Sequence, residues 1–339
     1  MSAPSEKTRL AGLSLNAITE ALSESGIDQK YAGRVAYWIY KKQVRSPLEM
    51  TNIGGTTRRL IDEHFNSGFT PPSAEIKSAD GSVKYIFTYS GNRRIETVYI
   101  PEAKRKTVCV STQCGCARGC TYCLTGEMGF NGNLTAGEIV NQVLAIPESA
   151  SITHVVFMGM GEPMDNIDEV LKSIEILTAE WGMALGSANI TVSTVGIIPG
   201  IEKLLAASRC NLTLSLVSPI ASERMVLVPT EKIYPAVSVM NLIRNTPPIK
   251  RRRFSIAYMM LSGINDTNEH LEALISLVKG SSVRVNLLKY HQHSDQPFVS
   301  SPSERMDLFR KKLLEAGISA SIRKSRGEDI SAACGMLGK

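Results

Sequence analysis

The sequence predicts an α/β protein built around a partial (β/α)6 barrel, with a small helical domain before the barrel and a β-hairpin between the two. Three patterns carry this prediction. Residues 1–72 show only a helical period, residues 73–104 hold two aromatic-rich stretches around one turn, and residues 105–339 alternate β-branched and helical stretches. Consecutive strand–helix units give parallel strands, and six units are too few for a closed eight-stranded barrel.

The segment 1–72 is expected to form a helical accessory domain. Three stretches place apolar residues at helical spacing: 13–22, 31–42 and 57–65. The aromatic residues Tyr37, Trp38 and Tyr40 are interpreted first as core residues of this domain. The alternative is an RNA-binding surface whose outer face carries three basic side chains: Lys41, Lys42 and Arg45.

The segment 73–104 is expected to form a β-hairpin extension. The stretches VKYIFTY and RRIETVYI are rich in aromatic and β-branched residues, and Ser90–Asn92 separates them with residue types typical of turns. Glu96 lies in the second stretch between apolar neighbours. A glutamate in a strand usually faces solvent, so the strand pattern leaves a solvent-facing and a functional role equally open.

The segment 105–339 carries the expected barrel. Its strands are predicted at TVCVS, HVVFMGMG, ITVSTV, NLTLSLV, FSIAYMML, VRVNLL and ISASIRK. Its helices are predicted at residues 133–144, 167–179, 198–207, 237–244, 268–279 and 303–316. Thr135 and Glu138 have the spacing of a capping box at the start of the first of these helices. Sites in such barrels lie at the carboxyl ends of the strands, so the loop after TVCVS is expected at the functional end.

That loop contains a compact group of cysteines. Five of the seven cysteines lie between residues 107 and 129, and Cys116, Cys120 and Cys123 follow the spacing C-x-x-x-C-x-x-C. Structural zinc sites normally use four ligands, commonly from two separate pairs, and no second pair follows here. Three thiolates on a 4Fe–4S cube leave one iron open for a ligand. The spacing therefore favours a cluster over a zinc knuckle or free thiols, and it resembles that of radical S-adenosylmethionine (SAM) enzymes. Cys114 and Cys210 are interpreted as buried structural thiols.

Polar residues follow several of the other predicted strands. The second strand ends in Gly159–Pro163, the third in Ser193–Gly196 and the fourth in Ser215–Pro219, and Lys289–His291 follows the sixth. Glycines allow a ligand to approach the backbone, and a carboxylate accepts hydrogen bonds from an ammonium group. Because these strand ends meet at one rim beside the cysteine loop, they predict a SAM pocket.

Longer blocks resemble the RlmN/Cfr family of radical SAM RNA methyltransferases over nearly the full chain. The blocks that carry this resemblance are IETVYIPE, CVSTQCGCARGCTYCLTGEMGF, MGMGEPMDN, VSTVGIIPGI and RKSRGEDISAACG. The last block is the most specific, because other radical SAM enzymes lack it. The resemblance implies a radical SAM barrel that ends in a loop with a catalytic cysteine.

The resemblance also assigns roles to individual residues. It implies three catalytic positions: Glu96, Cys109 and Cys334. It implies seven positions that bind SAM: Gly161, Glu162, Ser193, Ser215, Leu216, Val217 and His291. It implies that the 4Fe–4S cluster is held by the same three cysteines that the spacing singles out: Cys116, Cys120 and Cys123.

The family's reaction is methylation of carbon 2 of an adenosine in 23S rRNA, with tRNA as a further candidate substrate and two SAM molecules used per turnover. By resemblance, Cys334 first accepts a methyl group from SAM. A second SAM yields a 5′-deoxyadenosyl radical, which activates that methyl group for addition to adenine. Glu96 then removes the ring proton, and Cys109 releases the product with formation of a Cys109–Cys334 disulfide.

Two alternatives stay open. The first is methylation of carbon 8 of the same adenosine, as in the antibiotic-resistance branch of the family. The second, from a different functional class, is a non-catalytic iron–sulfur or zinc RNA-binding protein. One departure from the family bears on the site: the motif S-L-H-[AS]-P reads SLVSP here, so Val217 replaces its histidine.

The composition of the chain indicates its cellular location and its class of partners. The chain has 339 residues and a net charge of +6, with 43% hydrophobic and 21% charged residues. No apolar run approaches the ~18 residues of a membrane span, and the first residues have no signal-peptide core. These features predict a cytoplasmic protein, and the family implies a monomer that takes electrons from a donor such as flavodoxin. Basic runs are candidates for phosphate contacts: Arg93–Arg94, Lys104–Lys106, Lys250–Arg253, Arg323, Lys324 and Arg326.

Overall fold

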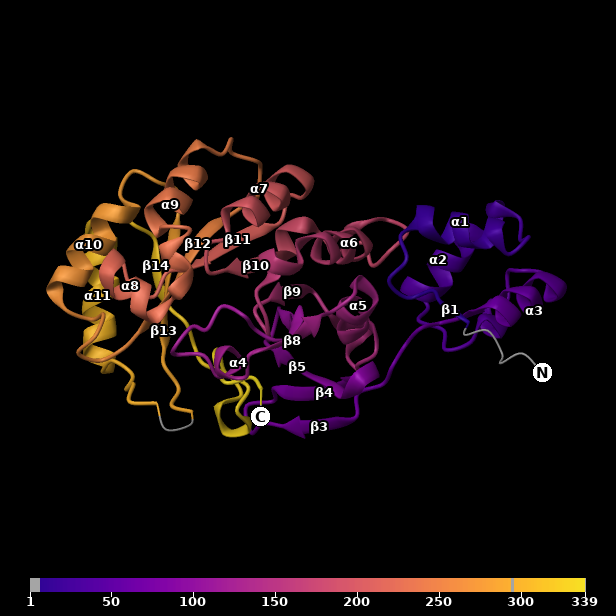
Figure 1. Cartoon of the computed structure of the whole chain (residues 1–339), viewed down its shortest axis with the longest axis horizontal. Helices are drawn as coiled ribbons and strands as arrows, with labels where there is room; N and C mark the ends of the chain where they lie inside the picture. The colour runs from indigo at the N-terminus through magenta and orange to yellow at the C-terminus, as the bar shows by residue number, and fades with distance from the viewer. Residues whose placement is uncertain (1–6, 294–295, 339) are drawn as a thin grey trace.

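A single ten-stranded sheet organises the molecule (Figure 1). The computed structural model describes residues 7–293 and 296–338. The first residues of the chain, on which the prediction about a signal peptide depends, lie partly outside the described residues. The strand order is β14-β13-β12-β11-β10-β9-β6-β5-β4-β3. From β6 to β14 every pair of neighbours is parallel. Within the described chain these seven strands do not close on themselves, which confirms the predicted partial barrel.

The barrel strands and helices lie close to their predicted positions. The parallel strands are β6 (Lys106–Val110), β9 (His154–Phe157), β10 (Ile190–Thr194), β11 (Asn211–Ser215), β12 (Phe254–Met260), β13 (Arg284–Lys289) and β14 (Ala320–Ile322). The predicted helices are α5 (Ala136–Leu144), α6 (Ile167–Thr178), α7 (Ile198–Ala207), α9 (Ala236–Asn245), α10 (Asn268–Val278) and α11 (Ser303–Glu315). The capping box of Thr135 and Glu138 at the start of α5 is confirmed. Short helices α4 (Leu124–Glu127) and α8 (Ala221–Leu227) were not predicted, because each spans too few residues to show a period.

An antiparallel extension continues the same sheet. The predicted hairpin is β4 (Val83–Tyr89) and β5 (Arg93–Pro101), and β5 pairs antiparallel with β6. A further strand, β3 (Ala74–Lys77), pairs with β4 at the edge. The sequence did not predict β3 because its side chains are all exposed, so it lacks the alternation that marks a half-buried strand. A second hairpin, β7 (Gln113–Gly115) and β8 (Phe130–Asn133), flanks the cysteine loop and was also not predicted.

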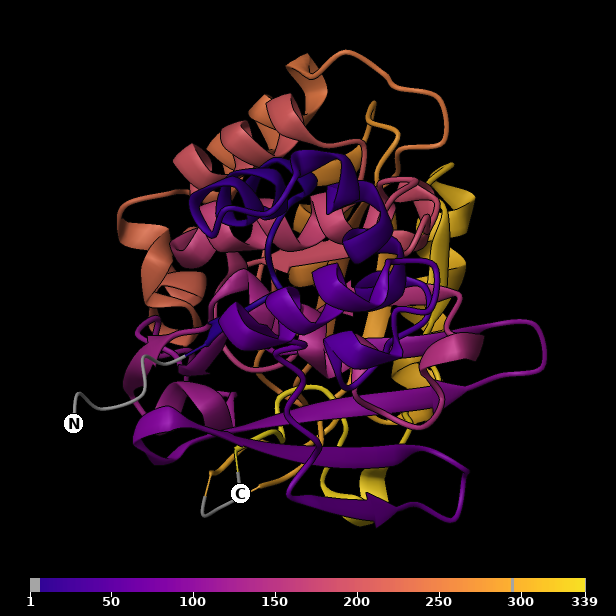
Figure 2. The same ribbon diagram turned by 90° about the vertical axis from the view of Figure 1, so that its right-hand side faces the viewer.

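The N-terminal helices form a separate module at one end of the molecule (Figures 1 and 2). The three predicted helices are α1 (Leu15–Glu24), α2 (Ala32–Tyr40) and α3 (Gly55–His64). They enclose their own apolar core, which extends onto Val140 and Leu144 of α5 and Ile176 of α6. Tyr40 is buried in that core, as expected, whereas Tyr37 is 41% exposed. The domain limits of 1–72, 73–104 and 105–339 remain a prediction.

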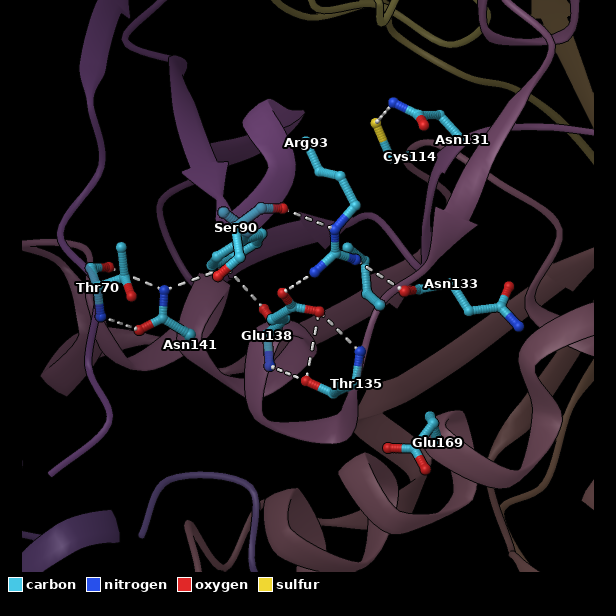
Figure 3. Close-up of polar contacts among 12 residues, drawn as sticks. Thr70, Ser90, Arg93, Cys114, Asn131, Asn133, Thr135, Glu138, Asn141 and Glu169 are labelled. Atoms are coloured by element: carbon cyan, nitrogen blue, oxygen red, sulfur yellow. Dashed lines mark hydrogen bonds and ion pairs between the residues drawn. The ribbon is translucent and has the colours of Figure 1, made fainter. Parts of the chain in front are cut away.

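The linker, the hairpin and the cysteine loop meet at the start of α5 (Figure 3). The Asn141 side chain exchanges two hydrogen bonds with the Thr70 backbone, at 2.8 and 2.9 Å. Arg93, at the start of β5, forms an ion pair with Glu138 and donates to the carbonyl of Asn133 at 2.9 Å. These contacts fix the cysteine loop against the extension. None of the described helices is long and apolar enough to cross a membrane.

Candidate active site

One pocket opens at the carboxyl ends of the parallel strands, where the sequence predicts the site. Its walls come from the cysteine loop, from the ends of β9 to β13 and from the last residues of the chain. Most of the predicted site residues line it: Cys116, Cys120, Cys123, Gly161, Glu162, Ser193, Ser215, Val217 and Cys334. The pocket therefore gathers segments that lie more than 200 residues apart in the sequence.

The cysteine loop is folded tightly enough to present its three thiols to one pocket. Gly115 has a φ of +73°, and a Cβ there would lie 1.8 Å from the carbonyl oxygen of Gly129, so no larger residue fits. Beyond it, the Cys116 N–H donates to the same carbonyl at 2.8 Å. Burial raises the pKa of Cys116 to about 12, and also raises the pKa of Cys120 and Cys123. Burial is the largest cause in each case, and a bound metal centre would favour the charged thiolate forms.

The donor set fits an iron–sulfur cube better than a single ion. Over residues 7–293 and 296–338, no three His, Cys, Asp or Glu side chains are close enough together to hold one metal ion. A zinc ion needs four such ligands within bonding distance of one point. A cube extends over several atoms, so its thiolates stand further apart around a shared cavity. The three cysteines border one such shared cavity.

Glu162 lies buried beside these thiols, at the end of β9. Its carboxylate accepts hydrogen bonds from the backbone N–H groups of Met164 and Val195, at 3.0 and 2.9 Å. Burial raises its pKa to about 7, because these hydrogen bonds only partly offset the loss of water. The preceding Gly161 has a φ of +96° and touches Gln113, which leaves no room for a side chain. A cationic ligand group would favour the charged form of this carboxylate.

The ends of β10 and β11 are held together by polar contacts. The hydroxyls of Ser193 and Ser215 lie 3.2 Å apart and face the pocket. Behind them, the buried Arg224 donates to the carbonyls of Val195, Ser215 and Leu216. A buried ion pair with Glu231 compensates the positive charge of Arg224. Sequence reasoning missed Arg224, because it lies in the short helix α8 and resembles any surface arginine of a helix.

Two predicted SAM-binding residues do not line the pocket. Leu216 is fully buried, and its backbone N–H donates to the Ala257 carbonyl at 3.0 Å, so it joins β11 to β12. His291 contacts the C-terminal segment instead: its Nε2 lies 2.7 Å from the Ser325 hydroxyl and its Nδ1 lies 3.7 Å from Glu328. Their predicted role in binding SAM remains a prediction.

The C-terminal segment, residues 323–338, brings Cys334 into the pocket. The carbonyl of Gly335 accepts from the Leu124 N–H at 2.9 Å, and the carbonyl of Leu337 accepts from the Thr125 hydroxyl at 2.7 Å. Cys334 is exposed to solvent through the pocket, although the surrounding protein raises the pKa of its thiol. Burial, and then the neighbouring Cys334, raise the pKa of Cys109 on β6. The fold thus brings two cysteines that are 225 residues apart in the sequence close enough for their charges to interact.

Glu96 does not face solvent, which rules out that alternative for this residue. It is 1% exposed on β5, its Oε2 accepts from the Gly338 N–H at 3.2 Å, and the Lys84 ammonium lies 3.5 Å from the same oxygen. Within the described part of the chain, its buried Oε1 accepts no hydrogen bond. Sequence reasoning missed Lys84. The predicted hairpin could have identified it, because a turn at Ser90–Asn92 places Lys84 diagonally opposite Glu96 on the same face of the sheet. Cys114 and Cys210 are buried, as predicted.

Comparison with known proteins agrees with this geometry. The Radical SAM superfamily matches residues 110–278. A protein of Parabacteroides distasonis named "Probable dual-specificity RNA methyltransferase RlmN" is 44% identical over 332 residues, which cover 98% of this chain and 97% of the relative. The "Dual-specificity RNA methyltransferase RlmN" of Desulfotalea psychrophila is 39% identical and covers 98% of this chain and 95% of its own.

A solved structure supports the same assignment. The crystal structure of a radical SAM methyltransferase from Sphaerobacter thermophilus superposes with a TM-score of 0.91 at 36% identity, over 97% of this chain and 99% of the other. Sequence and fold therefore agree over nearly the whole length of the protein. The chain belongs to the RlmN family of radical SAM RNA methyltransferases.

Proposed function

We propose that this enzyme methylates carbon 2 of an adenosine in 23S rRNA, and in tRNA as a second substrate, through a methyl group carried on Cys334. One observation carries the proposal: Cys334 lines the same pocket as the three cysteines proposed to hold the cluster. The names of the relatives, which are dual-specificity RNA methyltransferases, support RNA as the substrate class.

In this proposal, Cys116, Cys120 and Cys123 hold a 4Fe–4S cluster, and the pocket around Glu162, Ser193 and Ser215 binds SAM. When bound, these groups supply a methyl donor and a radical that activates the methyl group on Cys334, with two SAM molecules used per turnover. Glu162 is suited to the ammonium group of SAM, since it is buried and negatively charged when ionised. Leu216, Val217 and His291 complete the predicted set by shaping and closing the strand ends.

The chain's own residues divide the remaining work. The sulfur of Cys334 attacks the SAM methyl carbon, so a new sulfur–carbon bond forms as the sulfonium bond breaks. Glu96 accepts the proton from the ring carbon, and its free Oε1 has no competing donor among the described residues. Cys109 then attacks the Cys334 sulfur. A disulfide forms, the electron pair of the broken sulfur–carbon bond remains with the product, and a proton from solvent completes the new methyl group.

The substrate must present an unstacked adenosine, because a base inside a helix cannot reach a pocket of this kind. The N-terminal module and the basic runs are the proposed contacts to RNA phosphates, in line with the net charge of +6. The described chain has no helix that spans a membrane. We further propose a cytoplasmic monomer that accepts electrons from a flavodoxin-like donor.

Two variants test the division of labour between the cysteines. Cys109→Ala should accept the methyl group and then remain bound covalently to RNA through Cys334, which gives a nuclease-sensitive shifted band on a denaturing gel with labelled RNA. Cys334→Ala should give neither methylated protein nor a shifted band. A shifted band without Cys334, or full turnover without Cys109, would contradict the proposal. Mass spectrometry of the modified nucleoside then distinguishes carbon 2 from carbon 8.

A further inference from the structure

Lys84 is a buried charged residue that no step described above uses. It lies on β4, is 3% exposed, and is enclosed between the extension and the C-terminal segment. A buried ammonium group is costly unless it is paired and hydrogen-bonded. A strand of aromatic and β-branched residues such as VKYIFTY has no packing need for a lysine at this position, so its partners indicate its role.

Its two partners belong to two different parts of the proposed reaction. The Lys84 ammonium lies 3.5 Å from Oε2 of Glu96 and donates to the carbonyl of Ser331 at 3.3 Å. Ser331 stands three residues before Cys334 and has a φ of +51°, a conformation that few residues other than glycine adopt. One buried cation therefore touches both the carboxylate proposed as base and the segment that carries the methyl-bearing thiol.

Other contacts hold the C-terminal segment against the same antiparallel extension. The carboxylate of Asp329 accepts from the Ser78 hydroxyl at 2.6 Å and from the Ala79 N–H at 3.0 Å. In return, the carboxylate of Asp80 accepts from the Gly327 N–H at 2.9 Å. These bonds lie at the exposed turn between β3 and β4. Lys84 is a buried contact of this interface, and it lies next to Glu96 rather than at the rim.

We propose that Lys84 is a positioning residue of the reaction: it orients the Glu96 carboxylate, and it holds the Cys334 segment at a fixed place relative to that carboxylate. This inference rests on the proposed function, since it takes Glu96 as the base and Cys334 as the methyl carrier. Proton transfer to Glu96 neutralises the carboxylate and leaves Lys84 without its counter-charge. The ammonium then keeps only its bond to the Ser331 carbonyl.

The first experiment compares Lys84→Met, Glu96→Gln and Lys77→Met in single turnovers of the holoenzyme with a labelled 23S rRNA fragment that contains the target adenosine. Lys77 is the matched control, because it is an exposed lysine on the neighbouring strand β3. Lys84→Met should load the methyl group on Cys334 but resolve the covalent RNA adduct at least tenfold more slowly, as should Glu96→Gln. Lys77→Met should match the wild type.

The possible results separate this inference from the function on which it rests. Normal resolution in Lys84→Met beside slow resolution in Glu96→Gln overturns the inference alone. Slow resolution in Lys84→Met beside normal resolution in Glu96→Gln also overturns it, because the lysine would then act without the carboxylate. Normal resolution in both variants overturns the role of Glu96 in the proposed function as well.

A second experiment remains informative if Lys84→Met fails to fold. The double variant Lys84→Met with Glu96→Gln contains no uncompensated buried charge. Without RNA, iodoacetamide should alkylate Cys334 several-fold faster in the double variant than in Glu96→Gln alone, because the bond to the Ser331 carbonyl is lost. Peptide mass spectrometry measures the rate at Cys334 separately from the other cysteines. Equal rates in the two proteins would overturn the positioning role.

Discussion

At the scale of single residues, Val217 shows how the site imposes a conformation on the chain. Its φ is +61°, a value that β-branched residues rarely adopt. The Ser218 N–H donates to the Leu216 carbonyl at 2.8 Å, which closes a turn around Val217. The Asn265 side chain donates to the carbonyl of Val217 at 2.7 Å. These hydrogen bonds fix the backbone beside the pocket. The tight turn therefore depends on backbone contacts and on Asn265, and not on the side chain of the valine.

Replacing this valine with the histidine of the family motif should therefore be tolerated. Histidine enters the left-handed region more readily than valine, so Val217→His should change the free energy of unfolding by no more than about 1 kcal/mol. Turnover should stay within about tenfold, or ~1.4 kcal/mol of barrier. Urea unfolding and single-turnover rates measure the two effects. A loss of several orders of magnitude in rate would mean that the pocket is built around the valine.

Glu162 makes the stability of the protein without SAM depend on pH. Burial raises its pKa in the folded protein to about 7 from an ordinary value of 4.5, so between these values the folded state binds a proton that the unfolded state has lost. The stabilisation from this group is complete below pH 4.5 and is lost as the pH rises through about 7, by at most ~1.4 kcal/mol per unit.

The difference between the wild type and Glu162→Gln isolates this contribution, because other titrating groups are common to both proteins. Between pH 5 and 7.5, the free energy of unfolding of the wild type should fall relative to that of the variant. Urea titrations at a series of pH values provide the measurement. A constant difference across this range would contradict the raised pKa.

At the scale of elements, the short helix α8 supports the strand ends beside the pocket, although none of its own residues lines the pocket. Arg224 is 1% exposed and binds the carbonyls at the ends of β10 and β11, while Glu231 compensates its charge and accepts the N–H of Ala236 at the start of α9. Two strand ends and two helices are therefore tied to one ion pair. Removing one partner leaves the other charge buried and unpaired.

Arg224→Met should thus lower the free energy of unfolding by about 3–5 kcal/mol. Lys203→Met offers a matched control, because Lys203 forms an exposed ion pair with Asp168, and its loss should cost less than about 1 kcal/mol. Urea unfolding of both variants gives the comparison. Similar small effects in the two proteins would show that the buried pair does not hold the strand ends.

At the scale of the whole molecule, the N-terminal module and the barrel meet through a contact between two backbones. The first turn of α5 approaches residues 11–12 so closely that a Cβ on Gly137 would lie 2.7 Å from the carbonyl oxygen of Ala11. The module's core continues across this contact onto α5 and α6. Close approach of this kind is possible only with glycine.

Gly137→Ala should therefore loosen the seating of the module and lower the thermal unfolding midpoint, with a cost of about 1–3 kcal/mol from overpacking. Gly33→Ala in α2 is the control, because a Cβ at Gly33 meets no atom within 4 Å. It should instead stabilise the protein by about 0.5–1 kcal/mol through helix propensity. A midpoint in Gly137→Ala at or above that of the wild type would contradict the close contact.

The sequence by itself determined most of the elements and singled out the three cysteines of the loop. Local periodicity depends on neighbours three or four residues away, which is why helices such as α7 and α9 lie within a residue or two of their predicted bounds. The spacing of Cys116, Cys120 and Cys123 is likewise a local property. Where the local signal is weak, as in the exposed edge strand β3 or the seven-residue helix α8, the prediction failed.

The tertiary structure alone decided which distant side chains meet. Glu96 could be solvent-facing or buried on its strand pattern, and the seating of residues 323–338 over the extension made it buried, next to Lys84. The same seating brought Cys334 into the pocket of the three loop cysteines, and helix packing turned Arg224 inward. Such contacts join segments separated by many residues, and they form because the packed barrel as a whole buries apolar surface. No local period in the sequence encodes that free energy.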